Sequence, residues 1–181
     1  MQRVMIIGQP GSGKTTLARK LGVVTRLPVF HIDQIHWMPG WVERDRAEKT
    51  RMCQDVHAKP QWIFEGGHSQ TWAERLERAD TLIWLDVGLG RRLFRIVRRT
   101  LAGYGRSRPD LPANCPERFR AEFYSFIWRT RHTARANMSK FCDEADEETA
   151  VVKLSSLREV EAYLADVAEA MKAGALGLSH R

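Results

Sequence analysis

A glycine-rich stretch near the N-terminus offers the clearest chemistry in the sequence. An apolar run from Val4 breaks into Gly8-Gln9-Pro10-Gly11-Ser12-Gly13-Lys14-Thr15, and apolar residues then recur at helical spacing up to Leu21. In such a loop backbone N–H groups surround phosphate oxygens, the lysine neutralises them and the hydroxyl binds Mg2+. An ordinary strand-to-helix turn is the alternative, but the flanking pattern favours a nucleotide. The residues predicted to bind ATP are Gly8, Pro10, Gly11, Ser12, Gly13, Lys14, Thr15 and Thr16.

Acidic residues stand at or just beyond the ends of other apolar runs. Asp33 follows the run 28–32, Glu65 ends 62–65 and Asp86 ends 81–86. Ligands gather at the carboxyl ends of the strands in open α/β sheets. We therefore predict that Glu65, which two glycines follow, shares a magnesium site with Thr15; Asp86 is the alternative, and either carboxylate could instead cap a helix.

The segment after residue 30 suggests a pocket for a second substrate. His31, Asp33 and His36 resemble a zinc set, but alternating residues of a strand point to opposite faces. Asp33 is better explained as a residue that orients or deprotonates a phosphoryl acceptor. Trp37 and Trp41 could form an apolar wall of that pocket, or they could be ordinary core residues.

Positive charge is concentrated in one quarter of the chain. Twelve arginines, no lysine and three acidic residues lie between Arg91 and Arg135, which gives this stretch a net charge of +9, while the whole chain carries +7. Arginine suits bidentate contact with phosphate oxygens, although a solvated helix face is the simpler explanation. The stretch 103–116 is rich in Gly, Pro and Arg and lacks periodicity, which is typical of a lid over a phosphoryl-transfer site.

Length and composition indicate one domain. The chain has 181 residues, of which 43% are hydrophobic, and strand-like runs alternate with helical patterns as in a parallel sheet wrapped by helices. No apolar run approaches the length of a membrane span, and the N-terminus lacks the layout of a signal peptide. Cys53, Cys115 and Cys142 suggest neither disulfides nor zinc, so we expect a cytoplasmic protein. We place the domain at residues 1–173 and expect residues 174–181 to fray.

Six stretches, in order, resemble a known family: "GQPGSGKTTLARKL", "FHIDQIHWMPGW", "WIFEGG", "RLERADTLIWLD", "RSRPDLPANCPERF" and "LSSLREVEAYL". They are similar to the bacterial DNA topology modulation proteins, which are P-loop kinases similar to adenylate and shikimate kinases. The resemblance implies a three-layer P-loop fold with a five-stranded parallel sheet in the order 2-3-1-4-5. It also implies an acceptor-binding segment at about 33–60, an arginine-rich lid at about 101–117, and functional roles for Asp33, Arg99 and Arg108.

The sequence departs from these relatives at two places. Glu65 stands where they usually carry aspartate, and Gly66-Gly67-His68-Ser69 lacks the arginine that grips an acceptor phosphate in nucleoside monophosphate kinases. Arg44, Arg46 or Arg75 would have to replace it. The acceptor, a small molecule, is therefore a hydroxyl compound or a nucleoside monophosphate. The residues predicted to bind it are Asp33, Trp37, Trp41, Arg44, Gly66, Gly67 and Arg75.

The leading hypothesis is an ATP-dependent small-molecule kinase. Lys14 would contact the β and γ phosphates together with Mg2+, Arg99 and Arg108 would stabilise the transferring group, and Asp33 would position the acceptor. A nucleotide-gated regulator that binds DNA or RNA through its arginines and an ATP hydrolase serving a partner are the alternatives. The chain has no recognised nucleic-acid-binding motif, so any such binding should be weak and nonspecific.

Overall fold

The fold is a five-stranded parallel sheet enclosed by helices. The computed structural model describes residues 1–178, and side chains up to residue 174. The strands β1 (Arg3–Gly8), β2 (Val29–His31), β5 (Trp62–Glu65), β6 (Thr81–Leu85) and β7 (Ala150–Leu154) lie in the order β2-β5-β1-β6-β7. All four pairings are parallel. Numbered along the chain, this is the predicted order 2-3-1-4-5.

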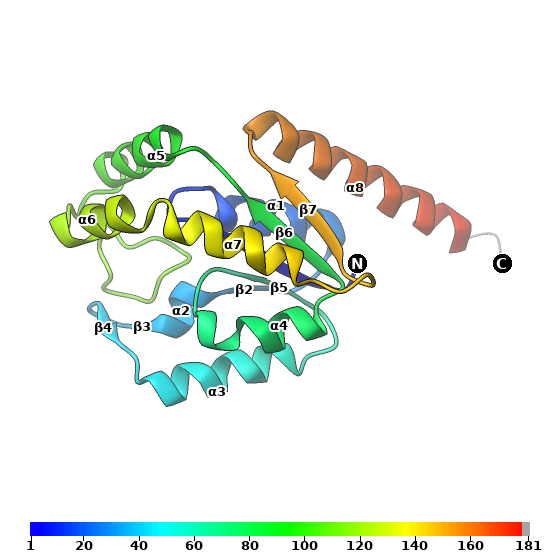
Figure 1. The fold of residues 1–181 in the computed structure, drawn as a ribbon, viewed down its shortest axis with the longest axis horizontal. Coiled ribbons are helices and arrows are strands. Elements are labelled where there is room, and N and C mark those ends of the chain that lie inside the picture. The colour runs from blue at the N-terminus through cyan, green and yellow to red at the C-terminus, as the bar shows by residue number, and fades with distance from the viewer. Residues whose placement is uncertain (179–181) are drawn as a thin grey trace.

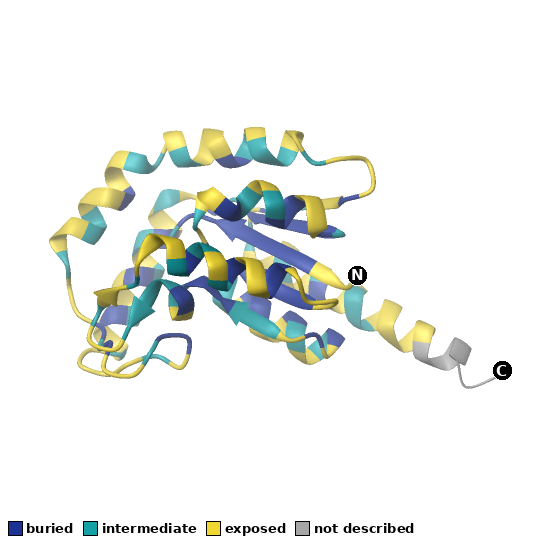
Figure 2. Ribbon diagram, turned by 90° about the horizontal axis from the view of Figure 1, so that it is seen from below, coloured by how far each residue is buried: buried dark blue, intermediate teal, exposed yellow. Residues whose placement is uncertain are grey.

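The central strands β1, β5 and β6 are buried on both faces because most of their residues are apolar. Val4 and Ile6 pack with Leu17, Leu21 and Leu164, so α1 (Lys14–Thr25) and α8 (Leu157–Leu178) cover one face. The opposite face packs against α2 (Ile32–His36), α3 (Arg46–His57), α4 (Trp72–Arg78) and α7 (Thr133–Asp143). Figure 2 shows the buried strands between helices whose outer sides are exposed. This arrangement gives the three layers that the sequence predicts.

Two long segments leave the sheet at the carboxyl ends of its strands. The first contains α2 and a small antiparallel hairpin of β3 (Trp37–Met38) and β4 (Val42–Glu43), which the sequence analysis did not predict. The second, residues 103–120, joins α5 (Leu89–Ala102) to α6 (Ala121–Thr130) and is called the lid segment below. Both lie at the same end of the molecule (Figure 1).

The lid segment is irregular but internally bonded. Tyr104 bridges to Glu117 and Ser107 to Pro116, so the two ends of the segment run side by side. The last strand leads to α8, which continues to Leu178 through part of the stretch 174–181 that was expected to fray. The remainder of that stretch, 179–181, lies outside the described residues. Within residues 1–178, no helix is both long enough and apolar enough to cross a membrane.

Candidate active site

The phosphate loop connects β1 to α1 and is shaped by glycines. Gly11 and Gly13 have φ of 78° and 104°, a region that residues with a side chain rarely adopt. A Cβ on Gly11 would lie 2.6 Å from the carbonyl oxygen of Arg92, so a side chain cannot be accommodated there. The loop therefore keeps its backbone close to α5, and its N–H groups precede the N-terminus of α1.

Two arginines of α5 hold the loop from outside. Arg92 Nη1 donates to the carbonyl oxygen of Pro10 at 3.2 Å, and Arg95 Nη1 donates to that of Ser12 at 2.8 Å. Arg92 is buried. These arginines bind two carbonyl oxygens of the loop. The backbone N–H groups of the loop are then the groups available to phosphate.

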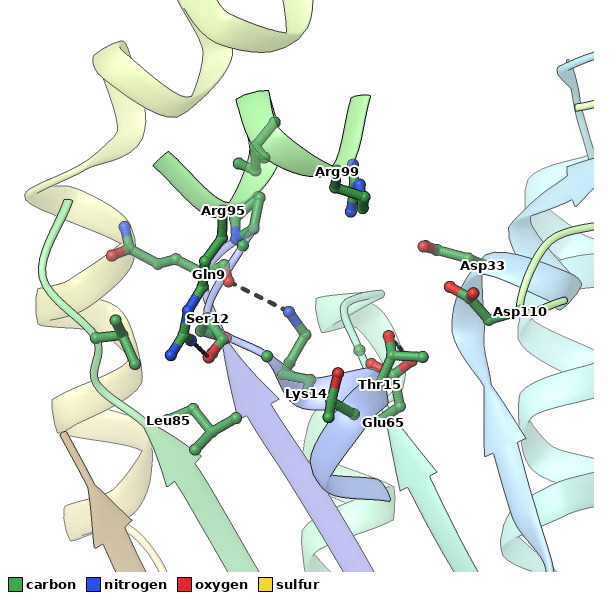
Figure 3. A pocket seen from close by; sticks show the side chains of 18 of the residues that line it. Gln9, Ser12, Lys14, Thr15, Asp33, Glu65, Leu85, Arg95, Arg99 and Asp110 are labelled. Atoms are coloured by element: carbon green, nitrogen blue, oxygen red, sulfur yellow. Dashed lines mark hydrogen bonds between the residues drawn. The ribbon is translucent and has the colours of Figure 1, made fainter. Parts of the chain in front are cut away.

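Lys14, the first residue of α1, lies inside this loop. Its Nζ donates to the carbonyl oxygen of Gln9 at 3.3 Å (Figure 3). Burial lowers the pKa of Lys14, and the positive charges of Arg92 and Arg99 act in the same direction, whereas Glu65 and Asp33 oppose them. An anion in the loop would compensate this buried ammonium. The buried Oγ of Ser12, which has no hydrogen-bond partner among the described residues, is a further polar atom suited to a phosphate.

Glu65 lies at the end of β5, where it connects two neighbouring elements. Its Oε1 accepts a hydrogen bond from Thr15 Oγ1 at 2.9 Å and lies 2.8 Å from His31 Nδ1. Burial alone would raise the pKa of Glu65, but the His31 contact and the charge of Lys14 outweigh it and lower the pKa. Glu65 is therefore a carboxylate at neutral pH.

A hydroxyl and a carboxylate in contact are oxygen ligands of the kind that Mg2+ takes, so the residues present fit the predicted magnesium site. Asp86, the alternative, is engaged elsewhere. Arg135 donates to both of its oxygens at 2.8 Å, and Lys153 Nζ lies 3.2 Å away. The arrangement favours Thr15 and Glu65 over Asp86 for this role.

A cavity of about 860 Å³ extends from the phosphate loop in two directions. One end reaches α1 and the start of α8, where it is lined by Lys20, Arg98, Ser156, Leu157 and Val160. The other end reaches α2, the hairpin and β5, and it is lined by Ile32, Asp33, Trp37, Trp41, Gly66 and Gly67. The phosphate loop therefore lies between two compartments, as a transfer between two substrates requires. Every predicted ATP-binding residue lines this cavity.

Asp33 faces the loop across the cavity (Figure 3). It is the second residue of α2, the short helix that begins where β2 ends. Burial raises the pKa of Asp33, and the nearby carboxylate of Glu65 adds to this, while Lys14 and Arg108 oppose it. A carboxylate with a raised pKa is a better proton acceptor near neutral pH, which suits the general-base role predicted for it.

Trp37 and Trp41 form a wall at the end of the cavity beside α2, where the sequence predicts the acceptor; this end is called the acceptor compartment below. Their rings lie edge to face, with centroids 5.3 Å apart. Trp41 Nε1 donates to the carbonyl oxygen of Pro116 at 3.1 Å, and its backbone N–H donates to Cys115 Sγ at 3.4 Å. The hairpin is therefore attached to the lid segment, and the wall is formed jointly by both.

The two arginines implied by the resemblance converge at the lid segment. Arg99 of α5 and Arg108 both form ion pairs with the buried Glu117, at 3.1 and 2.6 Å. Both contacts join the Nε atom of the arginine to Glu117 Oε1, and their angles are those of ion pairs without a formed hydrogen bond. Both residues line the cavity, and Arg99 points towards its centre in Figure 3. Glu117 thus gathers two positive charges opposite the phosphate loop.

The prediction that Arg75 grips an acceptor phosphate is wrong, because the side chain is fully buried. Its guanidinium stacks 3.9 Å from the Phe64 ring and donates to the carbonyl oxygen of Gly66 and to His57 Nε2, each at 3.2 Å. Burial lowers the pKa of Arg75 to about 10. Arg75 supports Gly66 from beneath the cavity and does not reach into it.

Arg44 is also placed away from the cavity, which corrects its predicted role. It donates to the carbonyl oxygen of Ile35 at 2.8 Å and to Glu48 at 2.6 Å. With Arg46 it lines a separate depression of about 430 Å³ beside α3 and η1 (Ser69–Thr71). The acceptor compartment consequently contains none of the three arginines proposed to replace the missing one.

Several cavity residues were not singled out by sequence reasoning. Gln9 Nε2 donates to the carbonyl oxygen of Arg131 at 3.0 Å and joins the loop to the start of α7. Asp110 and Glu117 line the cavity; both belong to the quoted lid stretch "RSRPDLPANCPERF", but the sequence analysis assigned neither of them a role. The presence of acidic residues within the basic stretch from Arg91 to Arg135 was the sequence signal that could have identified them.

Comparisons with known proteins support the fold. No family profile matches the chain, and no curated protein is similar in sequence. Among solved structures, shikimate kinase from Acinetobacter baumannii in complex with shikimate has a TM-score of 0.54 at 13% identity, with 96% of this chain and 94% of that chain covered. Shikimate kinase from Aquifex aeolicus vf5 gives 0.53 at 16%, covering 97% and 99%. A gluconokinase from Sinorhizobium meliloti 1021 gives 0.52 at 15%, covering 96% and 97%.

These similarities span nearly the whole of every chain. Together with the sheet order, they show that the protein has the fold of the P-loop kinases. The resemblance to the DNA topology modulation proteins rests on the sequence stretches quoted above.

Proposed function

We propose that the protein is an ATP-dependent kinase that phosphorylates a hydroxyl group of a small molecule. The observation that carries this proposal is the position of Asp33 across one cavity from Lys14 and the phosphate loop. A carboxylate opposite a phosphate site can orient a hydroxyl for in-line attack and accept its proton. The similar folds of shikimate kinase and gluconokinase support this choice, since their names describe the phosphorylation of hydroxyl compounds.

The charged and polar residues of the cavity then have the following roles in phosphoryl transfer. The loop and Lys14 bind the β and γ phosphates, and Arg99 and Arg108 stabilise the charge on the transferring group. Thr15 and Glu65 would hold Mg2+, which when bound neutralises the phosphate oxygens. A nucleoside monophosphate acceptor is disfavoured, because Arg44 and Arg75 lie outside the acceptor compartment. We also propose a reducing, cytoplasmic location, in keeping with three free cysteines.

The test is the transfer of label from γ-labelled ATP to a dialysable bacterial metabolite extract, with shikimate and gluconate as defined first substrates. We expect a labelled low-mass product with the wild-type protein and none with Lys14→Ala, since Lys14 contacts the transferred group. The variant should remain folded, because Lys14 faces the cavity and contributes little to the core. Release of labelled inorganic phosphate without any labelled acceptor would instead identify a hydrolase.

A further inference from the structure

The lid segment contributes a second carboxylate to the acceptor compartment. Asp110 is buried and lines the same cavity as Asp33. The two residues are brought together by their chain neighbours, since Gln34 Nε2 donates to the carbonyl oxygen of Pro109 at 3.3 Å. Both side chains point into the cavity from the side opposite the phosphate loop (Figure 3). A transfer to a hydroxyl needs one such carboxylate, so the second requires an explanation.

Asp110 is held in place from two sides. Arg108 Nη1 donates to its Oδ2 at 2.7 Å, and three further contacts attach the lid segment to the hairpin. In these contacts Gly40 N–H donates to the carbonyl oxygen of Asn114, Trp41 Nε1 donates to that of Pro116, and Cys115 Sγ donates to that of Met38. Asp110 is therefore part of a preformed wall.

The charges in this compartment restrict what the acceptor can be. Asp33 and Asp110 would repel a phosphate group placed between them, so the part of the acceptor that lies there is uncharged. A cationic amine is disfavoured as well, because Arg108 already pairs with Asp110. Neutral hydroxyl groups can donate to two carboxylates at once without adding charge. Two hydroxyl groups on adjacent carbon atoms can each donate a hydrogen bond to one of these two carboxylates, which lie on the same wall of the cavity.

The tryptophans add a second element of recognition. Trp37 and Trp41 offer apolar surface next to Asp33 in the same compartment. Carbon-bound hydrogens of a polyhydroxylated ring can pack on such surface while its hydroxyls reach the carboxylates. A compound with carbon-bound hydrogens on one side and hydroxyl groups on the other would fit both the tryptophan surface and the carboxylate oxygens.

We propose that Asp110 is a second acceptor-binding residue, and that the acceptor is a phosphate-free compound with vicinal hydroxyl groups. This inference rests on the kinase function proposed above. In the reaction, one hydroxyl oxygen forms a bond to the γ-phosphorus of ATP as the bond from that phosphorus to the oxygen bridging to the β-phosphate breaks. ADP leaves, and the hydroxyl proton passes to Asp33. Asp110 accepts a hydrogen bond from the neighbouring hydroxyl and so selects the acceptor.

The acceptor class is tested by treating the metabolite extract before γ-labelled ATP is added. Periodate, quenched before the assay, cleaves vicinal diols and should abolish formation of the labelled product. Treatment with a phosphatase that is then removed should leave it intact. Loss of product after phosphatase, survival after periodate, or loss after acylation of amines would each overturn the inference while leaving the kinase function standing. No labelled product from untreated extract would contradict the kinase function itself.

The role of Asp110 is tested with the acceptor purified from that extract. We expect Asp110→Asn to raise the acceptor KM about 10- to 100-fold, the value of a charge-assisted hydrogen bond, with the ATP KM nearly unchanged. Asp55→Asn is the matched control, because Asp55 pairs with Arg51 on the outer surface of α3. Glu117→Gln removes the other carboxylate that pairs with Arg108. If Asp110→Asn and Glu117→Gln both raise the ATP KM and spare the acceptor KM, Asp110 only holds Arg108 and the inference is wrong.

Discussion

Acidification should destabilise the protein through one buried histidine. His57 ends α3 and is 1% exposed, and its Nε2 accepts a hydrogen bond from Arg75. Burial and the charge of Arg75 lower the pKa of His57 from 6.5 to about 4, although Glu74, 3.5 Å from Nδ1, opposes them. The imidazole is thus neutral in the folded protein at pH values where it is protonated in the unfolded chain.

The size of the effect follows from proton linkage. Below pH 6.5 the unfolded chain binds a proton that the folded protein does not bind until the pH nears 4, so the free energy of unfolding falls as the pH falls through this window. At 1.36 kcal/mol per pH unit, His57 should account for a loss of about 2 to 3 kcal/mol by pH 4.5. Such a loss is a large fraction of the stability of an ordinary domain.

The assay is urea unfolding at several pH values between 7.5 and 4.5, with His57→Gln as the comparison. Glutamine still offers an oxygen acceptor to Arg75 Nε but does not titrate. His36 and His68, whose pKa values burial also lowers, contribute equally to both proteins and cancel. The wild-type protein should lose about 2 to 3 kcal/mol more than the variant over this range. Parallel pH profiles for the two proteins would refute the reasoning.

Three further outcomes are expected. Asp33→Asn should lower kcat about 10²- to 10⁴-fold, the usual contribution of a general base, and leave the ATP affinity measured by calorimetry unchanged. Gly66→Ala should lower the unfolding temperature and raise the acceptor KM, because a Cβ there would lie 2.1 Å from Ile32 Cγ2 and the backbone has a φ of 109°. Gly88→Ala is its matched control, because a Cβ there would meet nothing within 4 Å, its φ is -58°, and Gly88 is not part of the cavity lining. Binding to DNA, measured by fluorescence anisotropy, should be micromolar or weaker, indifferent to sequence and lost as salt increases, since only phosphate attraction contributes; tight, sequence-selective binding would favour the regulator instead.

The sheet and the phosphate loop could be predicted because their signals are local. Val4–Ile7 and Leu82–Leu85 are apolar without interruption, a pattern that is typical of a strand covered on both faces. The loop needs glycines, a lysine and a hydroxyl at fixed spacing, so its position is readable from a single sequence. The hairpin of Trp37–Met38 and Val42–Glu43 was missed because two-residue strands leave no periodic pattern.

Arg75 shows why other site residues could not be predicted. Its partners are a ring on β5, a carbonyl oxygen after β5 and a histidine at the end of α3, and these meet only when the helices pack on the sheet. The sequence displays a charge, and charged residues are seldom fully buried, so a cavity position was the natural expectation. Asp110 lies in a stretch that resembles the family, but it was given no role, because only the fold brings its side chain into the cavity that Asp33 lines.

The lid segment carries residues that we propose for both substrates, ATP and the acceptor. Arg108, for which we propose a phosphate-binding role, and Asp110, for which we propose an acceptor-binding role, are separated by Pro109 alone, and proline restricts the backbone on either side of it. The same segment is attached through Cys115 and Pro116 to the hairpin that carries the tryptophan wall. A displacement of the lid segment would therefore move both proposed groups together. If the proposed roles hold, water would be excluded from the phosphate only when the acceptor compartment is also formed, which would couple the choice of acceptor to the protection of ATP from hydrolysis.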